Sequence, residues 1–308
     1  MSVGATLAIG LAAGLDGLVG ELPNRLHPVA YLGRVVGWTD RTWSRPRLVG
    51  ALTAVVIPIT AATVAWGVVA AAARVGWIVG ALTAGFVLFT TTSLRALVET
   101  ARDVIETTET DPERARERVP ALVGRNPESL SPSELRSGAV ESAAENLADG
   151  LIAPLLAFVV GTQLAAALGA GPSLAFGAAA AGWVKGVNTL DSMLGYRSKP
   201  VGWAGARLDD LVMIIPARVA AVAIALAAGR PGSVAVARRW AHEPLSPNAG
   251  WPMATLAVAL DVRLVKPGAY DLNSDAALPD RKRGQHGVWV VTGAGVLSLL
   301  ASGVIVWL

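Results

Sequence analysis

The sequence predicts an all-α fold, a polytopic helical bundle integral to a membrane. Of its 308 residues, 53% are hydrophobic and only 16% are charged, whereas about a quarter of the residues of a soluble domain are charged. So few charges cannot cover a solvated surface, and much of the surface must face lipid. Long apolar runs alternate with polar segments, without the periodicity of a β-barrel. We expect about five to seven membrane helices, one of them broken or re-entrant, in a single domain over residues 1–308.

Six apolar runs approach or exceed the length of about 20 residues that crosses a bilayer. They are residues 2–15 (extended toward 20 past Asp16), 48–73, 75–94, 150–184, 211–229 and 287–308. Arg74 alone separates the second run from the third, which predicts a tight helical hairpin. The fourth run is too long for one span, and the turn signal at residues 169–172 divides it in two. Residues 1–15 carry no leading Lys or Arg, so we expect a retained membrane helix there and not a signal peptide.

Basic residues predict the orientation, because Lys and Arg favour the cytoplasmic side of a membrane. The polar segments expected to form a site on that face are 21–47, 95–149, 193–210 and 230–286. The first of them carries five arginines, whereas the opposite-side turns carry Arg74 alone. A straight span at 211–229 would place the last segment outside. Pro216 and Arg218 favour a broken or re-entrant helix instead, which returns that segment to the cytoplasmic face.

Composition excludes several kinds of site. The chain has no cysteine, which removes disulfides, Fe–S clusters, zinc–thiolate sites and cysteine nucleophiles. The net charge of +3 fits anionic headgroups or phosphorylated substrates. Nucleic acid is not an expected partner, because the basic residues are spread over several loops. The histidines at 27, 242 and 286 lack zinc-ligand spacing, and Walker A and Rossmann glycine motifs are absent.

The first polar cluster follows the first apolar run and contains Asp16, Glu21, Asn24, His27 and Arg34. A carboxylate near the end of a membrane helix is costly unless it has a partner or a function. The spacing alone favours an Asp–Arg pair at the membrane interface over a functional site.

The second cluster contains Glu141, Glu145 and Asp149, preceded by Arg125. Four-residue spacing places the three carboxylates on one face of a helix. Stacked carboxylates repel each other and require Mg²⁺, cations from elsewhere or full solvation. The uncharged run that follows limits solvation, so a metal or a cationic partner is favoured, and the solvated alternative stays open.

The third cluster is the densest, and the fourth is a short segment rich in Pro and Gly. The third comprises Lys185, Asn188, Thr189, Asp191, Ser192, Tyr196, Arg197, Lys199, Arg207, Asp209, Asp210 and Arg218. Its cations suit phosphate oxygens and its aspartates suit Mg²⁺, although a loop neutralised by its own ion pairs is the alternative. The fourth is residues 246–252, in which Ser246 and Asn248 cap helices or bind ligand. Capping is the simpler interpretation of that segment.

These motifs, taken in order, resemble those of the CobD/CbiB family of cobamide-biosynthesis proteins. His27-Pro28-Val29 resembles the N-terminal motif, and residues 139–154 resemble the central signature. Residues 187–196, 202–210, 215–218 and 246–253 resemble the later motifs. Among the departures from the family pattern, Asp261 and Asn273 stand where glycines are common.

The resemblance implies amide synthesis on a corrinoid. The family joins aminopropanol, or its O-phosphate, to a propionate carboxyl of adenosylcobyric acid, which gives adenosylcobinamide or its phosphate. ATP hydrolysis with Mg²⁺ drives the reaction, because a carboxylate needs activation before an amine can attack it. The bilayer and later-step cobamide enzymes are the expected partners. The oligomeric state is not predicted.

Roles follow from the resemblance together with the chemistry of each side chain. The expected catalytic residues are His27, Lys185, Asn188, Asp191 and Arg207, with Asp191 also a candidate Mg²⁺ ligand. The expected ATP-binding residues are Arg125, Arg218, Ser246 and Asn248. The expected metal ligands are Glu141, Glu145, Asp149, Asp209 and Asp210.

Other classes of protein remain as alternatives. A transporter could use Asp16, Lys185 and Arg218 to line a path. Transporters place their sites near the midplane, however, whereas the polar residues of this chain gather at helix ends. Another alternative is a non-catalytic membrane sensor related to the family, against which the intact carboxylates argue. A phosphotransferase acting on lipid-linked alcohols would require an Asp-Gly-Ala-Arg arrangement that the sequence lacks.

Overall fold

The computed structural model describes residues 2–118, 128, 130–196 and 198–308. The expected ATP-binding residue Arg125 lies outside these residues. Contacts divide the chain into two compact units, each built from separated stretches. Unit 1 comprises Met1–Ser93, Ala153–Met213 and Leu299–Leu308, and unit 2 comprises Leu94–Ile152 and Ile214–Ser298. The expectation of a single domain stays a prediction.

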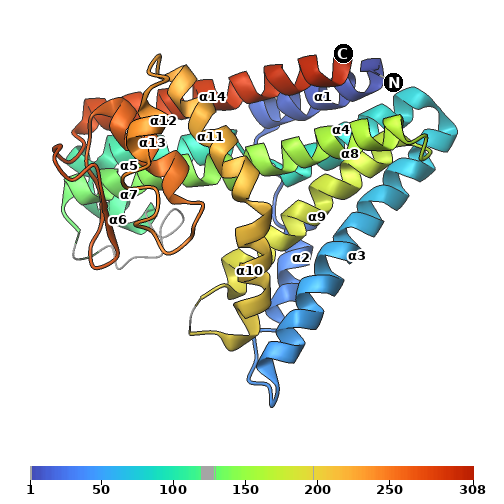
Figure 1. Cartoon of the computed structure of the whole chain (residues 1–308), viewed down its shortest axis with the longest axis horizontal. Coiled ribbons are helices and arrows are strands. Elements are labelled where there is room, and N and C mark those ends of the chain that lie inside the picture. Colours follow the sequence, from blue (N-terminus) through green and yellow to red (C-terminus); the bar gives the residue numbers. More distant parts are fainter. Residues whose placement is uncertain (1, 119–127, 129, 197) are drawn as a thin grey trace. The chain divides into compact units, whose positions relative to one another are not determined.

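Unit 1 is a bundle of long apolar helices with shorter amphipathic helices at one end (Figure 1). Its elements are α1 (Ser2–Val19), α2 (Pro28–Gly37), α3 (Pro46–Val75), α4 (Trp77–Thr91), α8 (Ala153–Ala167), α9 (Ser173–Leu194), the 3₁₀ turn η4 (Pro200–Gly202), α10 (Trp203–Val212) and the end of α14 (Arg281–Trp307). Buried side chains from α1, α3, α4, α8 and α9, among them Leu88 and Phe158, form its core. The helical hairpin predicted at Arg74 is confirmed, with its turn at Gly76, and so is the turn between α8 and α9.

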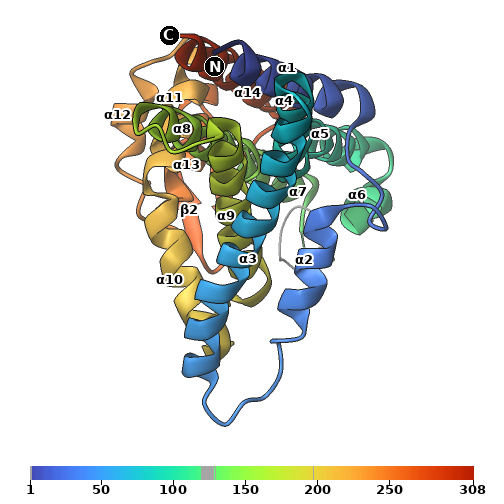
Figure 2. The ribbon, with the colours of Figure 1, turned by 90° about the vertical axis from the view of Figure 1, so that its right-hand side faces the viewer.

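Close backbone approach holds the helices of unit 1 together, and α3 and α9 run side by side (Figure 2). A Cβ on Gly186 of α9 would lie 2.9 Å from the Cα of Pro58 in α3. A Cβ on Gly85 of α4 would lie 2.7 Å from the carbonyl oxygen of Ala8 in α1. Small residues at such crossings are typical of membrane helices, whose association relies on packing because lipid is as apolar as the side chains.

Unit 2 combines helices with a short β-hairpin. Its elements are α5 (Arg95–Thr110), α6 (Pro112–Arg118), α7 (Pro132–Leu147), the π-helix η3 (Ala148–Ile152), α11 (Ile214–Ala227), α12 (Ser233–Ala237), α13 (Gly250–Leu260), β1 (Leu264–Lys266), β2 (Tyr270–Leu272) and most of α14. The strands pair antiparallel with Val265 opposite Asp271. This hairpin was not among the elements predicted from the sequence. Helix α7 begins with a capping box that was not predicted from the sequence. In it, the side chains of Ser131 and Glu134 accept hydrogen bonds from each other's backbone N–H groups.

A buried arginine ties together three parts of unit 2. Arg136 of α7 is 6% exposed. Its guanidinium donates to the Pro279 carbonyl (2.9 Å), the Thr108 hydroxyl (2.9 Å) and the Ser133 hydroxyl (3.0 Å). Because Thr108 belongs to α5 and Pro279 directly precedes α14, these bonds fix both helices against α7.

Among the described residues, five helices are long and apolar enough to cross a membrane, or up to six if a bent pair forms one span. The five are Ser2–Val19, Pro46–Val75, Trp77–Thr110, Pro132–Ala167 and Arg281–Trp307. The chain is therefore a polytopic helical membrane protein, as predicted. The bent pair is Pro200–Val212 with Ile214–Ala227, which confirms the predicted break. The break falls at Met213 because Pro216, near the start of α11, has no N–H to bond the carbonyl of Val212.

Candidate functional site

The predicted site residues fall into two groups, one in each unit. Unit 1 holds His27, Lys185, Asn188, Asp191, Arg207, Asp209 and Asp210, and we call these the unit 1 cluster. Unit 2 holds Glu141, Glu145, Asp149, Arg218, Ser246 and Asn248.

Helix α9 supplies three residues of the unit 1 cluster. Lys185, Asn188 and Asp191 recur every three residues, so they line one side of the helix. All three are partly exposed, whereas the intervening Val187 and Leu190 are buried. The polar side therefore faces outward from the bundle core, near the C-terminal end of an otherwise apolar helix.

His27 lies at the N-terminus of α2 and caps it. Its Nδ1 accepts a hydrogen bond from the backbone N–H of Val29 at 3.2 Å. Partial burial lowers the pKa of His27, the charge of Lys185 lowers it further, and the charge of Glu21 opposes both. Glu21 is held in turn by the Ser93 hydroxyl, which donates to its Oε1 at 2.6 Å. The imidazole is consequently neutral at pH 7, with a carboxylate and an ammonium group in its neighbourhood.

Two carboxylates of the unit 1 cluster act on each other across α9 and α10. Partial burial raises the pKa of Asp191, and the nearby charge of Asp210 raises it further. Arg207 lies one helical turn before Asp210, and its guanidinium nitrogen Nη1 is 3.6 Å from Asp210 Oδ2. This pair of interacting carboxylates with an adjoining guanidinium is the arrangement in the cluster that best suits a divalent cation bound together with phosphate.

The unit 2 carboxylates are arranged differently from the stacked face that the spacing predicted. Glu141 is 1% exposed, and its oxygens accept from the Ser137 hydroxyl at 2.6 Å and the Tyr270 hydroxyl at 2.7 Å. The Ser137 oxygen also accepts from the backbone N–H of Val265 at 2.8 Å. Glu141 thus anchors the β-hairpin to α7, a role for which Ser137 and Tyr270 are essential and which the sequence analysis missed.

Glu145 and Asp149 are partly exposed, and Asp149 lies in the π-helix η3. The wider turn of a π-helix ends the regular four-residue register at Leu147. Across the part of the chain that the structure describes, no three His, Cys, Asp or Glu side chains are grouped as a metal site. The assignment of Glu141, Glu145 and Asp149 to Mg²⁺ stays a prediction.

The expected ATP-binding residues of unit 2 contact one another. Arg218 donates to Asn248 Oδ1 and, at 3.0 Å, to the Ile214 carbonyl, and its guanidinium lies 5.0 Å from the ring centre of Trp251. Asn248 is 3% exposed. The Ser246 hydroxyl accepts from the backbone N–H of Asn248 at 3.3 Å, just before α13. Arg218 therefore fastens the loop 246–251 to α11. Ser246 bonds within the turn that precedes α13, and it does not cap that helix, because the N-cap residue Ala249 makes no side-chain cap hydrogen bond.

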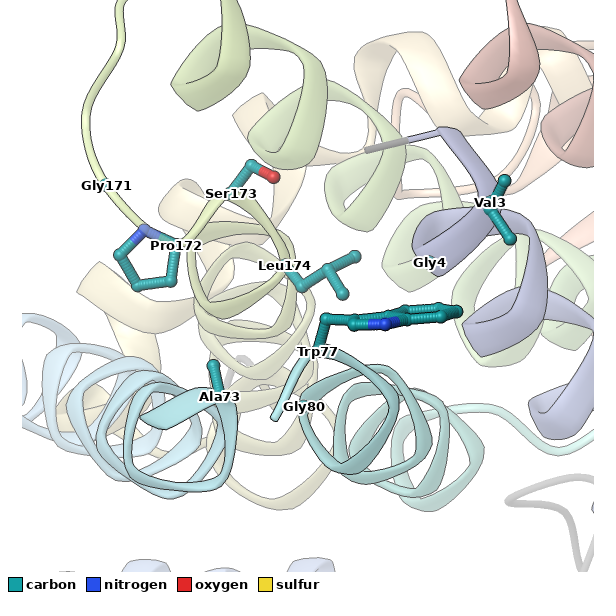
Figure 3. A pocket seen from close by; sticks show the side chains of 9 residues that line it. All are labelled: Val3, Gly4, Ala73, Trp77, Gly80, Gly171, Pro172, Ser173 and Leu174. Carbon is teal, nitrogen blue, oxygen red and sulfur yellow. The ribbon is translucent and has the colours of Figure 1, made fainter. Parts of the chain in front are cut away.

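An apolar cavity in unit 1 lies away from the unit 1 cluster. It measures about 510 Å³ and is lined by Val3 and Gly4 of α1, Ala73, Trp77 and Gly80 near the α3–α4 turn, and residues 171–174. In Figure 3 the Trp77 indole lies between Leu174 and the start of α1. Ser173 and Lys185 are twelve residues apart on α9, which corresponds to about 18 Å along the helix. None of the predicted site residues lines this cavity.

Known proteins are similar to the chain over nearly its whole length. A protein of Methanothrix thermoacetophila called "Probable cobalamin biosynthesis protein CobD" is 32% identical over 96% of this chain and 95% of its own length. "Cobalamin biosynthesis protein CobD" of Klebsiella pneumoniae is also 32% identical, over 96% of this chain and 95% of its own. The profile of the family described as CobD/Cbib protein matches residues 9–287. The chain belongs to the CobD/CbiB family.

Membership in the CobD/CbiB family gives the chain a role in cobalamin biosynthesis and confirms the resemblance that its motifs suggested. "Cobalamin biosynthesis protein CbiB" of Salmonella typhimurium is 30% identical over 94% of each chain. No solved structure matches the chain. The matched region contains both the unit 1 cluster and the unit 2 residues described above.

Proposed function

We propose that this CobD/CbiB protein is an ATP-dependent ligase of the cytoplasmic membrane. It joins aminopropanol, or its O-phosphate, to a propionate carboxyl of adenosylcobyric acid and forms adenosylcobinamide or its phosphate. The observation that carries the proposal is the unit 1 cluster, in which Lys185, Arg207, Asp191 and Asp210 gather groups suited to phosphate and Mg²⁺. The corrinoid substrate is proposed from the family motifs, which occur in this chain in the family's order.

The reaction needs two transfers. A propionate oxygen attacks the γ-phosphorus of ATP, and ADP leaves with the electrons of the broken P–O bond. The amine nitrogen then attacks the acyl carbon, phosphate leaves, and the nitrogen loses one proton as the amide forms. Phosphoryl transfer of this kind depends on positioning and on stabilisation of oxygen charge, so it needs cations more than it needs a protein nucleophile.

Residues of the unit 1 cluster fit these requirements. Lys185 and Arg207 would hold phosphate oxygens, and Arg207 offers a planar fork for two of them. Asp191 and Asp210 would hold Mg²⁺, which usually takes one or two protein carboxylates together with substrate phosphates and water. Burial raises the pKa of Asp191 and the charge of Asp210 raises it further, so a bound cation would stabilise the ionised form of Asp191. Bound Mg²⁺ would neutralise part of the phosphate charge.

The remaining assignments are part of the same proposal. Asp209 and Asn188 would contribute to metal and substrate binding beside the four residues above. Glu145 and Asp149 would hold a second cation or the corrinoid amides, and the site would open to the cytoplasm. For Arg218 and Asn248 the contact between them favours holding the loop 246–251 in place over direct binding of ATP.

The test is a reconstituted reaction. Purified protein in detergent receives adenosylcobyric acid, Mg²⁺-ATP and either aminopropanol or its phosphate, and product is followed by mass together with ADP release. Asp191→Asn should lower the rate at least 100-fold, while the exposed Glu243→Gln serves as a matched control with the wild-type rate. Product formation without ATP, or an unchanged rate in Asp191→Asn, would contradict the proposal.

A further inference from the structure

The Nδ1 atom of His27 makes a hydrogen bond within the protein. Nδ1 accepts the Val29 N–H at 3.2 Å, and Pro28, the first residue of α2, has no N–H to offer. An imidazole nitrogen that accepts a hydrogen bond carries no proton, so in the neutral ring the proton resides on Nε2. The cap therefore selects the Nε2–H tautomer.

The surroundings of His27 favour that neutral ring. The half-buried position and the ammonium of Lys185 on α9 both lower the pKa of His27. The carboxylate of Glu21 opposes them, and it is itself engaged by the Ser93 hydroxyl. Protonation at Nδ1 would in addition break the cap, because the ring would then present a donor to the Val29 N–H.

We infer that His27 binds substrate as a fixed hydrogen-bond donor through Nε2–H, and that it does not accept a proton in the reaction. Its ligand is an anionic oxygen, phosphoryl or acyl, held between this N–H and the Lys185 ammonium. This assignment rests on the proposed ligase function. It assigns His27 to substrate positioning and excludes it from proton transfer.

The geometry explains why a histidine suits this place. An N-cap residue must present an acceptor close to its own backbone, which Nδ1 does in the manner of an Asn side-chain oxygen. A donor for substrate must reach further out, which Nε2 does in the manner of a Gln amide nitrogen. Histidine combines both positions in a rigid ring, so the cap that starts α2 also orients the donor.

Two substitutions separate these functions. His27→Asn retains the cap acceptor and removes the distal donor, whereas His27→Gln retains the distal donor, cannot accept a proton at neutral pH and loses the cap. We expect His27→Asn to melt close to the wild type and to lose about 100-fold or more in kcat/KM. We expect His27→Gln to melt at a lower temperature and to remain within about tenfold of wild-type kcat/KM. The exposed His286→Gln is the control, with wild-type behaviour in both assays.

Two results would overturn the inference: wild-type activity in His27→Asn, or a folded His27→Gln as inactive as His27→Asn. If His27→Gln fails to fold, ¹⁵N NMR of the His242→Gln, His286→Gln variant reads the tautomer directly, because His27 is then its sole histidine. An Nε2–H signal at pH 7.5 is expected, and an Nδ1–H signal would refute the inference. Absence of ligase activity in the wild type would contradict the proposed function alone, since the tautomer is measured without substrate.

Discussion

Removing the hydrogen bond between Tyr270 and Glu141 tests whether the Glu141 carboxylate is structural or a metal ligand. Tyr270→Phe removes the hydroxyl that donates to Glu141 Oε2 at 2.7 Å and leaves the ring in place. A hydrogen bond to a charged group contributes about 1.5 to 3 kcal/mol to stability. At about 2 to 4 °C per kcal/mol for a unit of this size, the melting temperature should fall by roughly 3 to 12 °C. Tyr196→Phe, at an exposed tyrosine, should leave it unchanged.

The assay is thermal unfolding in detergent followed by circular dichroism, combined with a double-mutant cycle. Glu141→Gln should also destabilise the protein, and Tyr270→Phe together with Glu141→Gln should cost less than the sum of the single changes, because both remove the same bond. The Mg²⁺ concentration for half-maximal activity should stay within about twofold of wild type in Tyr270→Phe. A large rise in that concentration for Glu141→Gln, with unchanged stability and additive effects in the cycle, would refute the structural role and restore Glu141 as a metal ligand.

Three further outcomes are expected in the same detergent assay. Gly186→Ala places a methyl group 2.9 Å from the α3 backbone and should cost about 1 to 3 kcal/mol, whereas Gly303→Ala, with open space around it, should cost nothing measurable. Arg136→Met removes three buried hydrogen bonds and should cost about 3 to 5 kcal/mol, against less than about 1 kcal/mol for Arg95→Met in an exposed pair. Because the folded-state pKa of His27 is lowered, its contribution to stability is complete above about pH 6.5 and falls as the pH drops toward the lowered value. His27→Asn should flatten that part of the stability–pH curve, and an unchanged curve would contradict the lowered pKa.

Apolar length and turn residues were sufficient to predict most of the helical framework. The Arg74 hairpin, the turn at residues 169–172 and the break before Pro216 follow from local sequence, because a membrane helix satisfies its own backbone. The β-hairpin could not be predicted in this way, since each strand has only three residues and shows no periodicity. The division into two units depends on contacts between distant segments, which a single sequence does not reveal.

Two residues of unit 2 have left-handed backbone conformations that are unusual for residues other than glycine. The family resemblance implied that glycines are common at the positions of Asp261 and Asn273, and both residues adopt left-handed φ angles, 54° and 53°. Asn273 offsets the strain by donating to the Val262 carbonyl at 3.0 Å. Asp261 ends α13 as its C-cap residue. A non-glycine residue at a position where glycine is usual therefore predicts a left-handed conformation, stabilised by side-chain bonds where they are available.

The candidate site was harder to predict because long-range partners decide what a charged side chain does. The sequence offered Arg218 as a cation for phosphate, since an arginine within an apolar helix needs a function or a partner. In the structure the partner is the loop 30 residues later, where Asn248 Oδ1 accepts from the guanidinium and Trp251 lies against it. The role of Glu141 was hard to predict for the same reason, because its hydrogen-bond partner Tyr270 is 129 residues away. Arg218 holds a loop in place, so Lys185 and Arg207 become the principal candidates for binding phosphate among the described residues. Glu141 holds the β-hairpin in place, so Asp191 and Asp210 become the principal candidates for Mg²⁺. That assignment concentrates the proposed chemistry in the unit 1 cluster.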